Sequence, residues 1–421
     1  RFPSGHNGWY KMGIFTKERY WRVTQGSKGI PAVYEDQVEM LRELLLDSCR
    51  LRLRSDVPIG TGLSGGVDSS SIAACINQVG NEAVADRRAK NWQNAFVAGF
   101  PNTVMDETAA AREIATHLGI DLVQVLLDPS KLSKDVEHNS YMLEEIHEVN
   151  PLPHIHLYKK MREHGIVVSL DGHGGDELFC GYESSILHAI PDAFPSIKGV
   201  SGIMDIYRNI HPKNTEFSRI PNYRIPIYLI LARARQLYRV KDNSFILDVI
   251  KKSGSLEKHL FDLSYGSVLP TLLRNYDRYS MISGVEVRSP LLDPRIVKFS
   301  ANLPWTSKLR GGYSKAILRD ATASLLPESV IKNKHKIGFA PPISDWIRGP
   351  MKEYLLDEIQ SSDFLNADLI FPNALSNELR SIIFASKNEN LYRAEQTWKK
   401  FGVYLWEKAF LKNKDWQIRI G

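Results

Sequence analysis

A glycine- and serine-rich stretch at residues 63–70, LSGGVDSS, has the residue types needed to hold an anion. It follows an apolar run at 57–63, which predicts a buried strand, and precedes an apolar run from Ile72, which predicts a helix. Glycines let the backbone approach an oxyanion closely, and the first amides of a helix have no intrahelical acceptor. A helix cap alone needs only one serine, aspartate or glycine, and this stretch has several. We therefore predict an anion site formed by Leu63, Ser64, Gly65, Gly66, Asp68, Ser69 and Ser70.

A second dense stretch, VVSLDGHGGDELFCGY, occupies residues 167–182. A predicted strand at 166–170 runs into glycines and then into the paired carboxylates Asp176 and Glu177. These two residues could simply complement a helix dipole. However, Asp68 also begins a helix after a strand of what should be the same sheet, and ligands bind at the carboxyl ends of such strands. Because Mg²⁺ is usually held by one or two carboxylates plus phosphate oxygens, Asp68 and Asp176 predict a magnesium site.

The elements that must position these stretches alternate along the chain. Strands are predicted at 57–63, 94–100, 122–127 and 166–170, and helices at 35–54, 106–118, 133–149 and 155–164. This alternation predicts an α/β fold with a parallel sheet covered on both faces. We expect three parts: short strands at 1–25 that end a preceding domain or form a linker, an ATP-binding core at 26–185, and a mostly helical part at 186–421. The last part would complete the site, and its C-terminal aromatic residues Trp398, Phe401, Tyr404 and Phe410 are predicted to lie in a core.

The composition is that of a globular protein, with 43% hydrophobic and 24% charged residues in 421 positions. The net charge of +6 fits an enzyme that binds anionic ATP and is also compatible with an RNA partner, but the lack of a long basic arm disfavours a nucleic-acid partner. No apolar run has the length of a membrane span and no signal peptide is recognisable. The three cysteines, Cys49, Cys75 and Cys180, have no CxxC spacing, which favours a reducing, cytoplasmic setting.

The first stretch resembles the SGGxDSS signature of the PP-loop ATP pyrophosphatases, and the chain as a whole resembles the asparagine synthetase family. Four blocks match in order: SGGVDSS at 64–70, GHGGDELFCGY at 172–182, GVEVRSPLLD at 284–293, and a Lys-x-Gly-Phe stretch at 336–339 that is followed by Pro341-Pro342 and Trp346. Residues 1–21 are similar to the segment that joins the family's glutaminase domain to its synthetase domain.

The resemblance implies an enzyme that adenylates a small carboxylate with ATP and Mg²⁺, releases pyrophosphate and transfers ammonia to form an amide. It assigns the pyrophosphate to residues 64–70, adenosine to the backbone around Val97 and to Gly172, and charge neutralisation on the phosphates to Lys336. Glu286, together with Arg288, would either brace the site as a buried pair or touch substrate. The family's glutaminase uses an N-terminal cysteine, whereas the first cysteine here is Cys49. We therefore expect ammonia from glutamine through a domain or partner not in this chain, with free ammonia as the alternative source, and leave a homodimer open.

Two departures from the family pattern leave the acceptor open. His173 stands where these synthetases usually have Glu. It could accept a proton from the attacking amine, since histidine side chains as a class titrate near neutral pH, or it could be a hydrogen-bonding spacer. About 100 residues also separate Tyr182 from Gly284. The acceptor could therefore be aspartate, a sugar acid or a peptide carboxylate.

Two other functions are compatible with parts of the pattern. One is a tRNA-modifying enzyme, because such enzymes share the SGGxDS turn; the other is a catalytically silent relative. The second is disfavoured because both predicted metal carboxylates and Lys336 are present. His147, His154 and His156 cluster near Pro151 but do not share one helix face, so we interpret them as structural.

Overall fold

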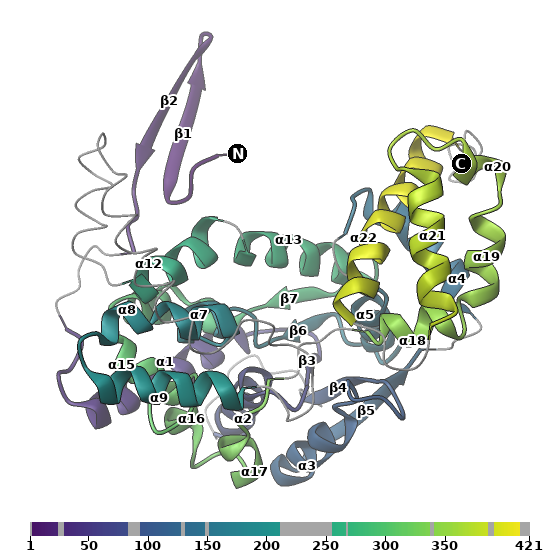
Figure 1. Cartoon of the computed structure of the whole chain (residues 1–421). Helices are drawn as coiled ribbons and strands as arrows, with labels where there is room; N and C mark the ends of the chain where they lie inside the picture. The colour runs from purple at the N-terminus through teal and green to yellow at the C-terminus, as the bar shows by residue number, and fades with distance from the viewer. Residues whose placement is uncertain are drawn as a thin grey trace.

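The computed structural model describes residues 2–23, 29–82, 93–127, 131–147, 151–210, 255–266, 268–336, 341–385 and 391–412. At its centre is a five-stranded sheet in the order β5-β4-β3-β6-β7, with every neighbouring pair parallel (Figure 1). The strands are β3 (Ile59–Gly62), β4 (Asn94–Gly99), β5 (Asp121–Leu126), β6 (Val168–Leu170) and β7 (Glu286–Arg288). The predicted α/β fold with a parallel sheet is thus confirmed. The sequence analysis missed β7, because three residues are too few to show a period.

The sheet is buried on both faces, as its apolar strands predict. Along β4, Ala95 and Val97 pack into one hydrophobic cluster while Phe96 packs into another on the opposite face. The first face is covered by α1 (Tyr34–Arg52), α2 (Val67–Gly80), α3 (Thr108–Leu118), α14 (Pro294–Ala301) and α16 (Ala316–Thr322). The second face is covered by α5 (Leu152–Glu163) and α13 (Val268–Met281).

Local signals in the sequence explain where several of these helices begin and end. The carboxylate of Asp106 accepts the backbone N–H of Thr108 at 3.2 Å, at the start of α3. Gly119 ends the same helix in the left-handed conformation, with φ at 66°. The predicted helix at 133–149 is shorter than expected: α4 (Leu132–Leu143) ends at Glu144, whose φ is 58°.

Short elements connect the sheet to the rest of the chain. They are α6 (Gly175–Phe179), α7 (Glu183–His188), α8 (Ile190–Ala193), α9 (Ile197–Asn209), α12 (Ser255–Phe261), η2 (Asp262–Gly266), η3 (Pro290–Leu292), α15 (Trp305–Lys308) and α17 (Glu328–Lys332). Helices α7, α8, α9 and α12 share a hydrophobic cluster of their own. The sequence also predicts helices at 227–238 and 244–252, and both ranges lie outside the described residues.

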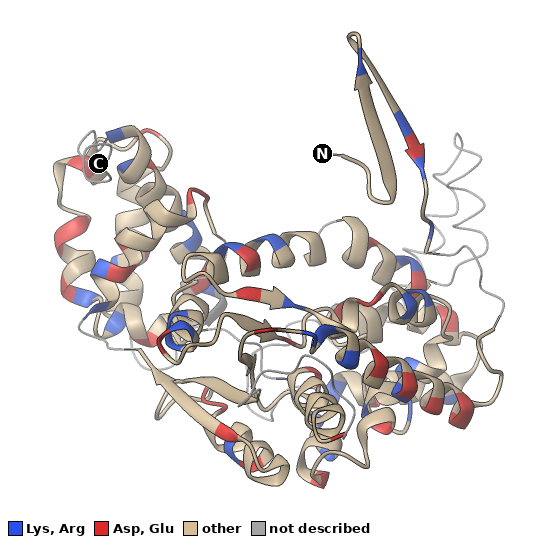
Figure 2. Ribbon diagram, turned by 180° about the vertical axis from the view of Figure 1, so that it is seen from behind, with Lys and Arg blue, Asp and Glu red and all other residues tan. Residues whose placement is uncertain are grey.

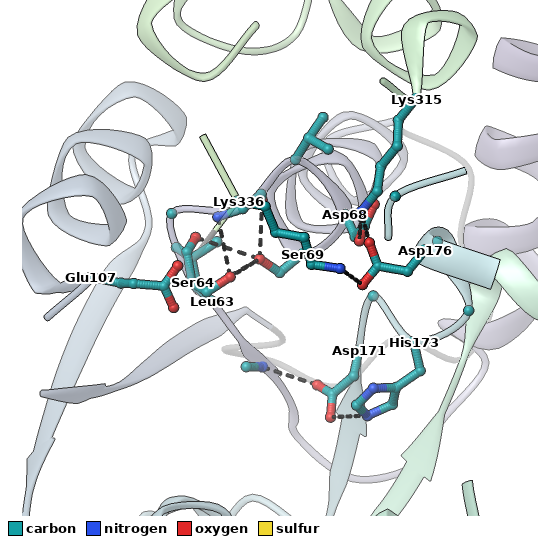
Figure 3. Close-up of a pocket in the computed structure, with 18 of the residues that line it drawn as sticks. Leu63, Ser64, Asp68, Ser69, Glu107, Asp171, His173, Asp176, Lys315 and Lys336 are labelled. Carbon is teal, nitrogen blue, oxygen red and sulfur yellow. Dashed lines mark hydrogen bonds and ion pairs between the residues drawn. The ribbon is translucent and has the colours of Figure 1, made fainter. Parts of the chain in front are cut away.

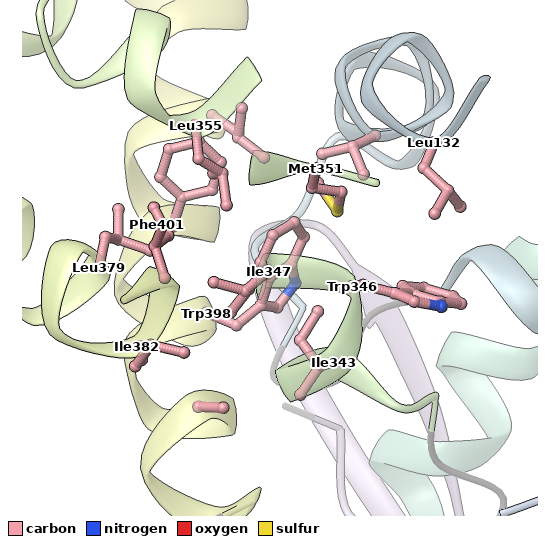
Figure 4. Close-up of a cluster of buried hydrophobic side chains, with 14 of the residues drawn as sticks. Leu132, Ile343, Trp346, Ile347, Met351, Leu355, Leu379, Ile382, Trp398 and Phe401 are labelled. Carbon is pink, nitrogen blue, oxygen red and sulfur yellow. The ribbon is translucent and has the colours of Figure 1, made fainter. Parts of the chain in front are cut away.

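The C-terminal part is a helical bundle beside the sheet (Figure 1). It consists of α18 (Ile343–Arg348), α19 (Lys352–Glu358), α20 (Ser362–Leu365), α21 (Pro372–Ile383), α22 (Leu391–Glu407) and η4 (Lys408–Lys412). Trp398, Phe401 and Tyr404 are buried in it, which confirms their predicted core role. Leu132 of α4 joins the same cluster (Figure 4), so the bundle docks on the α/β part through apolar contacts. Phe410 is half-buried and stacks on Tyr141.

At the other end of the chain, β1 (His6–Lys11) and β2 (Ile14–Arg19) form an antiparallel hairpin that projects from the body (Figure 1). Trp21 follows the hairpin and lies 6.0 Å from the ring of Tyr265. Strand β7 comes from the part expected at 186–421 yet belongs to the central sheet, so the sheet extends beyond residue 185.

Charged residues of both signs are interspersed along the helices, whereas the sheet strands carry few of them (Figure 2). Among the described residues, no helix combines the length and the apolar composition needed to cross a membrane.

Candidate functional site

Both glycine-rich stretches open into one cavity of about 320 Å³. They follow β3, the middle strand of the sheet, and its neighbour β6, and meet because the carboxyl ends of parallel strands share one edge. Residues of α3, α5, α13 and the loop at 333–336 complete the lining. Of the predicted site residues, those that line the cavity are Leu63, Ser64, Gly65, Gly66, Asp68, Ser69, Val97, Gly172, His173, Asp176 and Lys336.

The first turn is held closed by its own serines (Figure 3). The hydroxyls of Ser64 and Ser69 lie 2.9 Å apart, and the Ser64 backbone N–H donates to Ser69 Oγ at 3.1 Å. The glycines are needed for close packing. A Cβ on Gly65 would lie 2.6 Å from the Cβ of Ala110 in α3, and a Cβ on Gly172 would lie 2.6 Å from the backbone nitrogen of Ser69. The two turns therefore touch through backbone atoms.

Two carboxylates and two lysines converge beside this turn (Figure 3). Lys315 forms an ion pair with Asp68 and lies 2.6 Å from Asp176 Oδ1. Lys336 Nζ lies 2.7 Å from Asp176 Oδ2 and 3.9 Å from the centre of the Tyr182 ring. The Lys336 backbone N–H donates to the carbonyl of Ile210 at 2.8 Å, which holds the lysine loop against α9.

Burial and pairing shift the titration of these groups in opposite directions. Burial would raise the pKa of Asp176, but the charges of Lys315 and Lys336 hold it well below its ordinary value. Burial raises the pKa of Asp68, and the neighbouring Asp176 adds to that effect against the opposing charge of Lys315. Burial likewise lowers the pKa of Lys336 in spite of Asp176. When two carboxylates share one buried place, the ionised form of one makes it harder for the other to ionise. The pKa values of Asp68 and Asp176 therefore move apart.

Lys315 is a member of this cluster that the sequence analysis missed. Its backbone adopts the left-handed conformation, with φ at 53°, immediately before α16. This turn directs a buried side chain toward carboxylates more than 130 positions away in sequence. Neither its neighbours nor its spacing resembles a known ligand pattern, so we find no signal in the sequence that would have identified it.

Asp68 and Asp176 are suited to holding a divalent cation. Asp68 Oδ1 is buried and has no hydrogen-bond partner within the described residues. Its other oxygen already binds the positive charge of Lys315. The donor set is thus two carboxylates beside a predicted phosphate turn, which matches the preference of Mg²⁺ for a few carboxylates plus phosphate oxygens.

His173 lies on the other side of the second turn and is paired with Asp171. Its Nε2 is 3.5 Å from Asp171 Oδ2, and its ring stacks on Tyr276 with a centre-to-centre distance of 3.9 Å. Asp171 also accepts hydrogen bonds from the hydroxyl of Tyr158 at 2.8 Å and from the hydroxyl of Ser169 at 2.6 Å. Although burial raises the pKa of Asp171, the neighbouring His173, the Ser169 hydroxyl and the Gly62 backbone N–H hold it below its ordinary value. An ionised carboxylate therefore faces the imidazole.

Glu107 is a second buried carboxyl group that the sequence analysis did not place in the site. It precedes α3, lines the cavity beside Ser64 (Figure 3) and accepts the backbone N–H of Gly65. Burial, against the opposing effect of that hydrogen bond and with a smaller contribution from the charge of Asp106, raises its pKa to about 7. The acidic pair Asp106-Glu107 directly before α3 is the feature of the sequence that could have identified it.

Two predicted site residues lie elsewhere. Ser70 is fully buried, and its hydroxyl donates to the carbonyl of Gly66 at 2.7 Å inside α2. Glu286 is 59% exposed on the edge strand β7 and is absent from the residues that line the cavity. It pairs with Arg288 at 2.6 Å, but the pair is not buried as expected. Arg288 donates to the carbonyl of Arg52, so the pair braces β7 against the end of α1.

The three histidines near Pro151 separate in the structure. His154 lines the cavity, although we had interpreted it as purely structural. His156 instead pairs with Asp135 at 3.0 Å, and the ring of His147 lies 5.3 Å from that of Tyr279. Within the described ranges, no group of three or more His, Cys, Asp or Glu side chains could hold a metal ion by itself.

Comparison with known proteins identifies the family that this chain resembles. The family model described as asparagine synthase matches residues 40–418. Asparagine synthetase [glutamine-hydrolyzing] 1 of Bacillus subtilis is 25% identical over 83% of this chain and 56% of its own length. Asparagine synthetase B of Escherichia coli is 24% identical, over 93% and 60%. Amidase chyE of Penicillium rubens is 25% identical, over 75% and 54%.

This chain spans somewhat more than half the length of these relatives. The family match nevertheless covers most of the chain and includes both turns, β7 and both lysines of the cavity. The chain therefore belongs to the asparagine synthase family.

Proposed function

We propose that this chain is the synthetase part of a ligase that activates a carboxylate with ATP and converts it to an amide with ammonia. The observation that carries the proposal is the meeting of Asp68, Asp176, Lys315 and Lys336 at the glycine–serine turn. Amides of a helix N-terminus, hydroxyls, two lysines and two carboxylates together suit a metal-bound pyrophosphate group. The family match supports the same reaction class.

In the first step, a carboxylate oxygen of the acceptor attacks the α-phosphorus of ATP. The bond from that phosphorus to the bridging oxygen breaks, and pyrophosphate leaves with the bonding electrons. The turn at 64–69 would hold the departing group, and Lys315 and Lys336 would stabilise its growing negative charge. Mg²⁺ held by Asp68 and Asp176 would supply further charge neutralisation on the same oxygens. The backbone around Leu63, Val97 and Gly172 would line the adenosine.

In the second step, the nitrogen of ammonia attacks the carbonyl carbon of the acyl-adenylate. The carbon–oxygen bond to AMP breaks, and the nitrogen must lose a proton to give a neutral amide. We propose that His173 accepts this proton, because Asp171 faces its Nε2 and the stacked ring of Tyr276 fixes the plane of the imidazole. A carboxylate that orients an imidazole also stabilises its protonated form. Glu286 has no part in this scheme, since it lies outside the cavity.

The test is a product analysis of the purified chain with ATP, Mg²⁺, ammonium chloride and a panel of carboxylic acids. We expect AMP and pyrophosphate, with no requirement for glutamine. Asp68→Asn should lower the rate at least 100-fold, because it weakens the cation site, whereas Asp357→Asn at an exposed position of α19 should leave it unchanged. Formation of ADP and phosphate, or full activity of Asp68→Asn, would contradict the proposal.

The tRNA-modifying alternative has no specific observation in its favour. Charges of both signs are mixed over the helices (Figure 2), and the family match points to amide formation. Ammonia itself would come from glutamine hydrolysed on a separate domain or partner. If so, this chain should be active with ammonium chloride as the only nitrogen donor, in the absence of glutamine.

A further inference from the structure

One side of the cavity is lined by a surface of which the proposed chemistry uses only His173. Its members are His154 and Tyr158 of α5, Leu269, Leu272 and Tyr276 of α13, and His173 itself; we call these six residues the aromatic wall. Leu269, Leu272 and Tyr276 have the spacing of one helix face, which is why α13 presents all three to the cavity. The wall thus joins two helices that cover the same side of the sheet.

The rings of the wall are held by one another. His173 lies at 26° to Tyr276, close to parallel stacking. The ring of His154 meets that of Tyr276 edge to face, 4.9 Å away, and Tyr279 packs behind both. The hydroxyl of Tyr279 hydrogen-bonds His147 Nδ1 at 3.1 Å. Such mutual packing fixes the orientation of the rings and leaves a flat surface preformed.

The fixed charge at this end of the cavity is negative. Asp171 lies beside His173 and Tyr158 of the wall, and His173, Ser169 and the Gly62 backbone N–H hold its pKa below the ordinary value. Burial lowers the pKa of His154 to about 3, so this ring is neutral at neutral pH. Burial also raises the pKa of Tyr276, which keeps its hydroxyl uncharged. The positive charges of Lys315 and Lys336 lie at the phosphate end and are already paired with Asp176.

The order of the strands indicates which group, adenosine, pyrophosphate or the acceptor acid, contacts the aromatic wall. Of the proposed adenosine contacts, Val97 lies in β4 and Gly172 follows β6, directly before His173; Leu63 and the phosphate turn follow β3, which lies between these two strands. An acceptor carboxylate must reach the α-phosphorus between adenosine and pyrophosphate. The remainder of the acceptor then extends toward the β6 side, where the wall lies.

We infer that the acceptor is a monocarboxylic acid with a flat, uncharged, aromatic body, and not aspartate; this inference rests on the proposed function. Stacked rings and leucines favour such a body. Aspartate would instead place a second carboxylate and an ammonium group against rings and leucines, where burying a charge is costly unless it is paired. Asp171 could pair with the ammonium group but would repel the second carboxylate, and this repulsion is weakly screened in a partly buried place.

The test uses ATP–pyrophosphate exchange, which reports adenylation without any amine. The probes are benzoate, phenylacetate and indole-3-acetate as aromatic acids, hexanoate as a flexible apolar acid, and aspartate and glutamate as dicarboxylates. We expect at least one aromatic acid to exceed aspartate at least tenfold in kcat/KM and to exceed hexanoate as well. Binding of the same acids in the presence of ATP is measured in parallel by calorimetry.

Three variants test the wall itself. Tyr276→Leu should raise the KM for the best aromatic acid about tenfold while the Kd for ATP stays the same. Leu272→Arg should supply a positive charge that can pair with a second carboxylate. The kcat/KM of exchange with aspartate, relative to that with the best aromatic acid, should then rise about tenfold. Tyr279→Phe, behind the wall, keeps its ring and should behave as the parent. Thermal unfolding and ATP binding show whether each variant is folded.

The possible failures are distinct. Exchange driven best by aspartate or glutamate would overturn this inference and leave the proposed function standing. Binding of an aromatic acid without any exchange would support the wall and contradict the proposed function. Neither binding nor exchange with any acid would overturn both. An unchanged KM for the aromatic acid in Tyr276→Leu would also overturn the assignment of the wall.

Discussion

At the residue scale, the site depends on side chains that hold one another in place. His173 is contacted by Asp171 at 3.5 Å and by the Tyr276 ring at 3.9 Å, so its position is set from two directions. A distance of 3.5 Å is long for a hydrogen bond, and catalytic hydrogen bonds often tighten only when substrates bind. The proposed role of His173 therefore concerns the second step and should be separable from the first.

We expect His173→Gln to lower the rate of amide formation by about 10²–10⁴-fold, the usual contribution of general base catalysis. ATP–pyrophosphate exchange should change by less than about threefold, since glutamine preserves a polar side chain of similar reach. His156→Gln is the matched control, because His156 also pairs with an aspartate but outside the cavity. Equal losses in both half-reactions would show that His173 is a spacer for the whole site.

Glu107 makes a prediction about pH. Its pKa rises from 4.5 to about 7 on folding, so between these values the folded state holds a proton that the unfolded chain has lost. The free energy of unfolding should then fall as pH rises through this window, by up to about 3 kcal/mol for this group. Glu107→Gln cannot ionise and should be more stable than the parent at pH 8 but equal at pH 4, below the window.

Urea unfolding at the two pH values measures this difference. Glu353→Gln, at an exposed position of α19, is the control and should match the parent at both. A Glu107→Gln protein that is less stable at pH 8 would mean that the ionised carboxylate is needed for the turn at Gly65.

At the scale of elements, the site depends on how closely α6, α7 and α16 approach the first turn. Gly181 lies between α6 and α7, and a Cβ there would lie 1.9 Å from Asp176 Oδ1 and 2.2 Å from Lys315 Cε. A Cβ on Gly175 would likewise lie 2.4 Å from the carboxylate of Asp68. These glycines leave room for the ion pairs, so their role is steric and does not involve an unusual backbone conformation.

We therefore expect Gly181→Ala to displace the Lys315–Asp176 pair. The predicted result is a loss of at least tenfold in pyrophosphate formation and a destabilisation of about 1–3 kcal/mol from overpacking. Gly202→Ala in α9 is the control, because nothing lies within 4 Å of its added Cβ. It should be neutral or more stable by up to about 1 kcal/mol, since alanine favours helix. Both variants are compared by pyrophosphate release and thermal unfolding, and a fully active Gly181→Ala would refute the steric argument.

At the scale of the whole molecule, the α/β part and the C-terminal bundle share a continuous apolar core. The buried cluster of α18, α21 and α22 includes Leu132 of α4 and Phe100, which directly follows β4 (Figure 4). Phe401 is at its centre, with its ring near those of Trp398, Tyr404 and Tyr354. The bundle is thus packed onto the sheet and not joined to it by a linker alone.

Truncating Phe401 to alanine should cost about 3–5 kcal/mol of unfolding free energy, because it removes a fully buried ring and leaves a cavity. Phe371→Ala deletes the same atoms at a position that is 85% exposed and should change stability by less than about 0.5 kcal/mol. Denaturant unfolding followed by circular dichroism measures both. Similar losses in the two variants would contradict the proposed packing.

The sequence predicted the features that depend on local physics. Glycines and serines between an apolar strand and a helix specify a turn with exposed amides, and this holds for residues 63–70 wherever the rest of the chain lies. The alternation of apolar strands and helices predicted the parallel sheet, because each strand must be covered on both faces. The shared edge of that sheet then brought Asp68 and Asp176 together as expected.

Tertiary structure alone decided the rest. Lys315 meets Asp68 across 247 positions and does so from a left-handed turn that no sequence pattern announces. Glu286 is near β6 in the sheet yet faces solvent, because β7 is an edge strand. His154 and Tyr276 meet only because α5 and α13 cover one face of the sheet. Contacts of this kind depend on how distant elements pack, and packing is a property of the whole chain that local spacing does not encode.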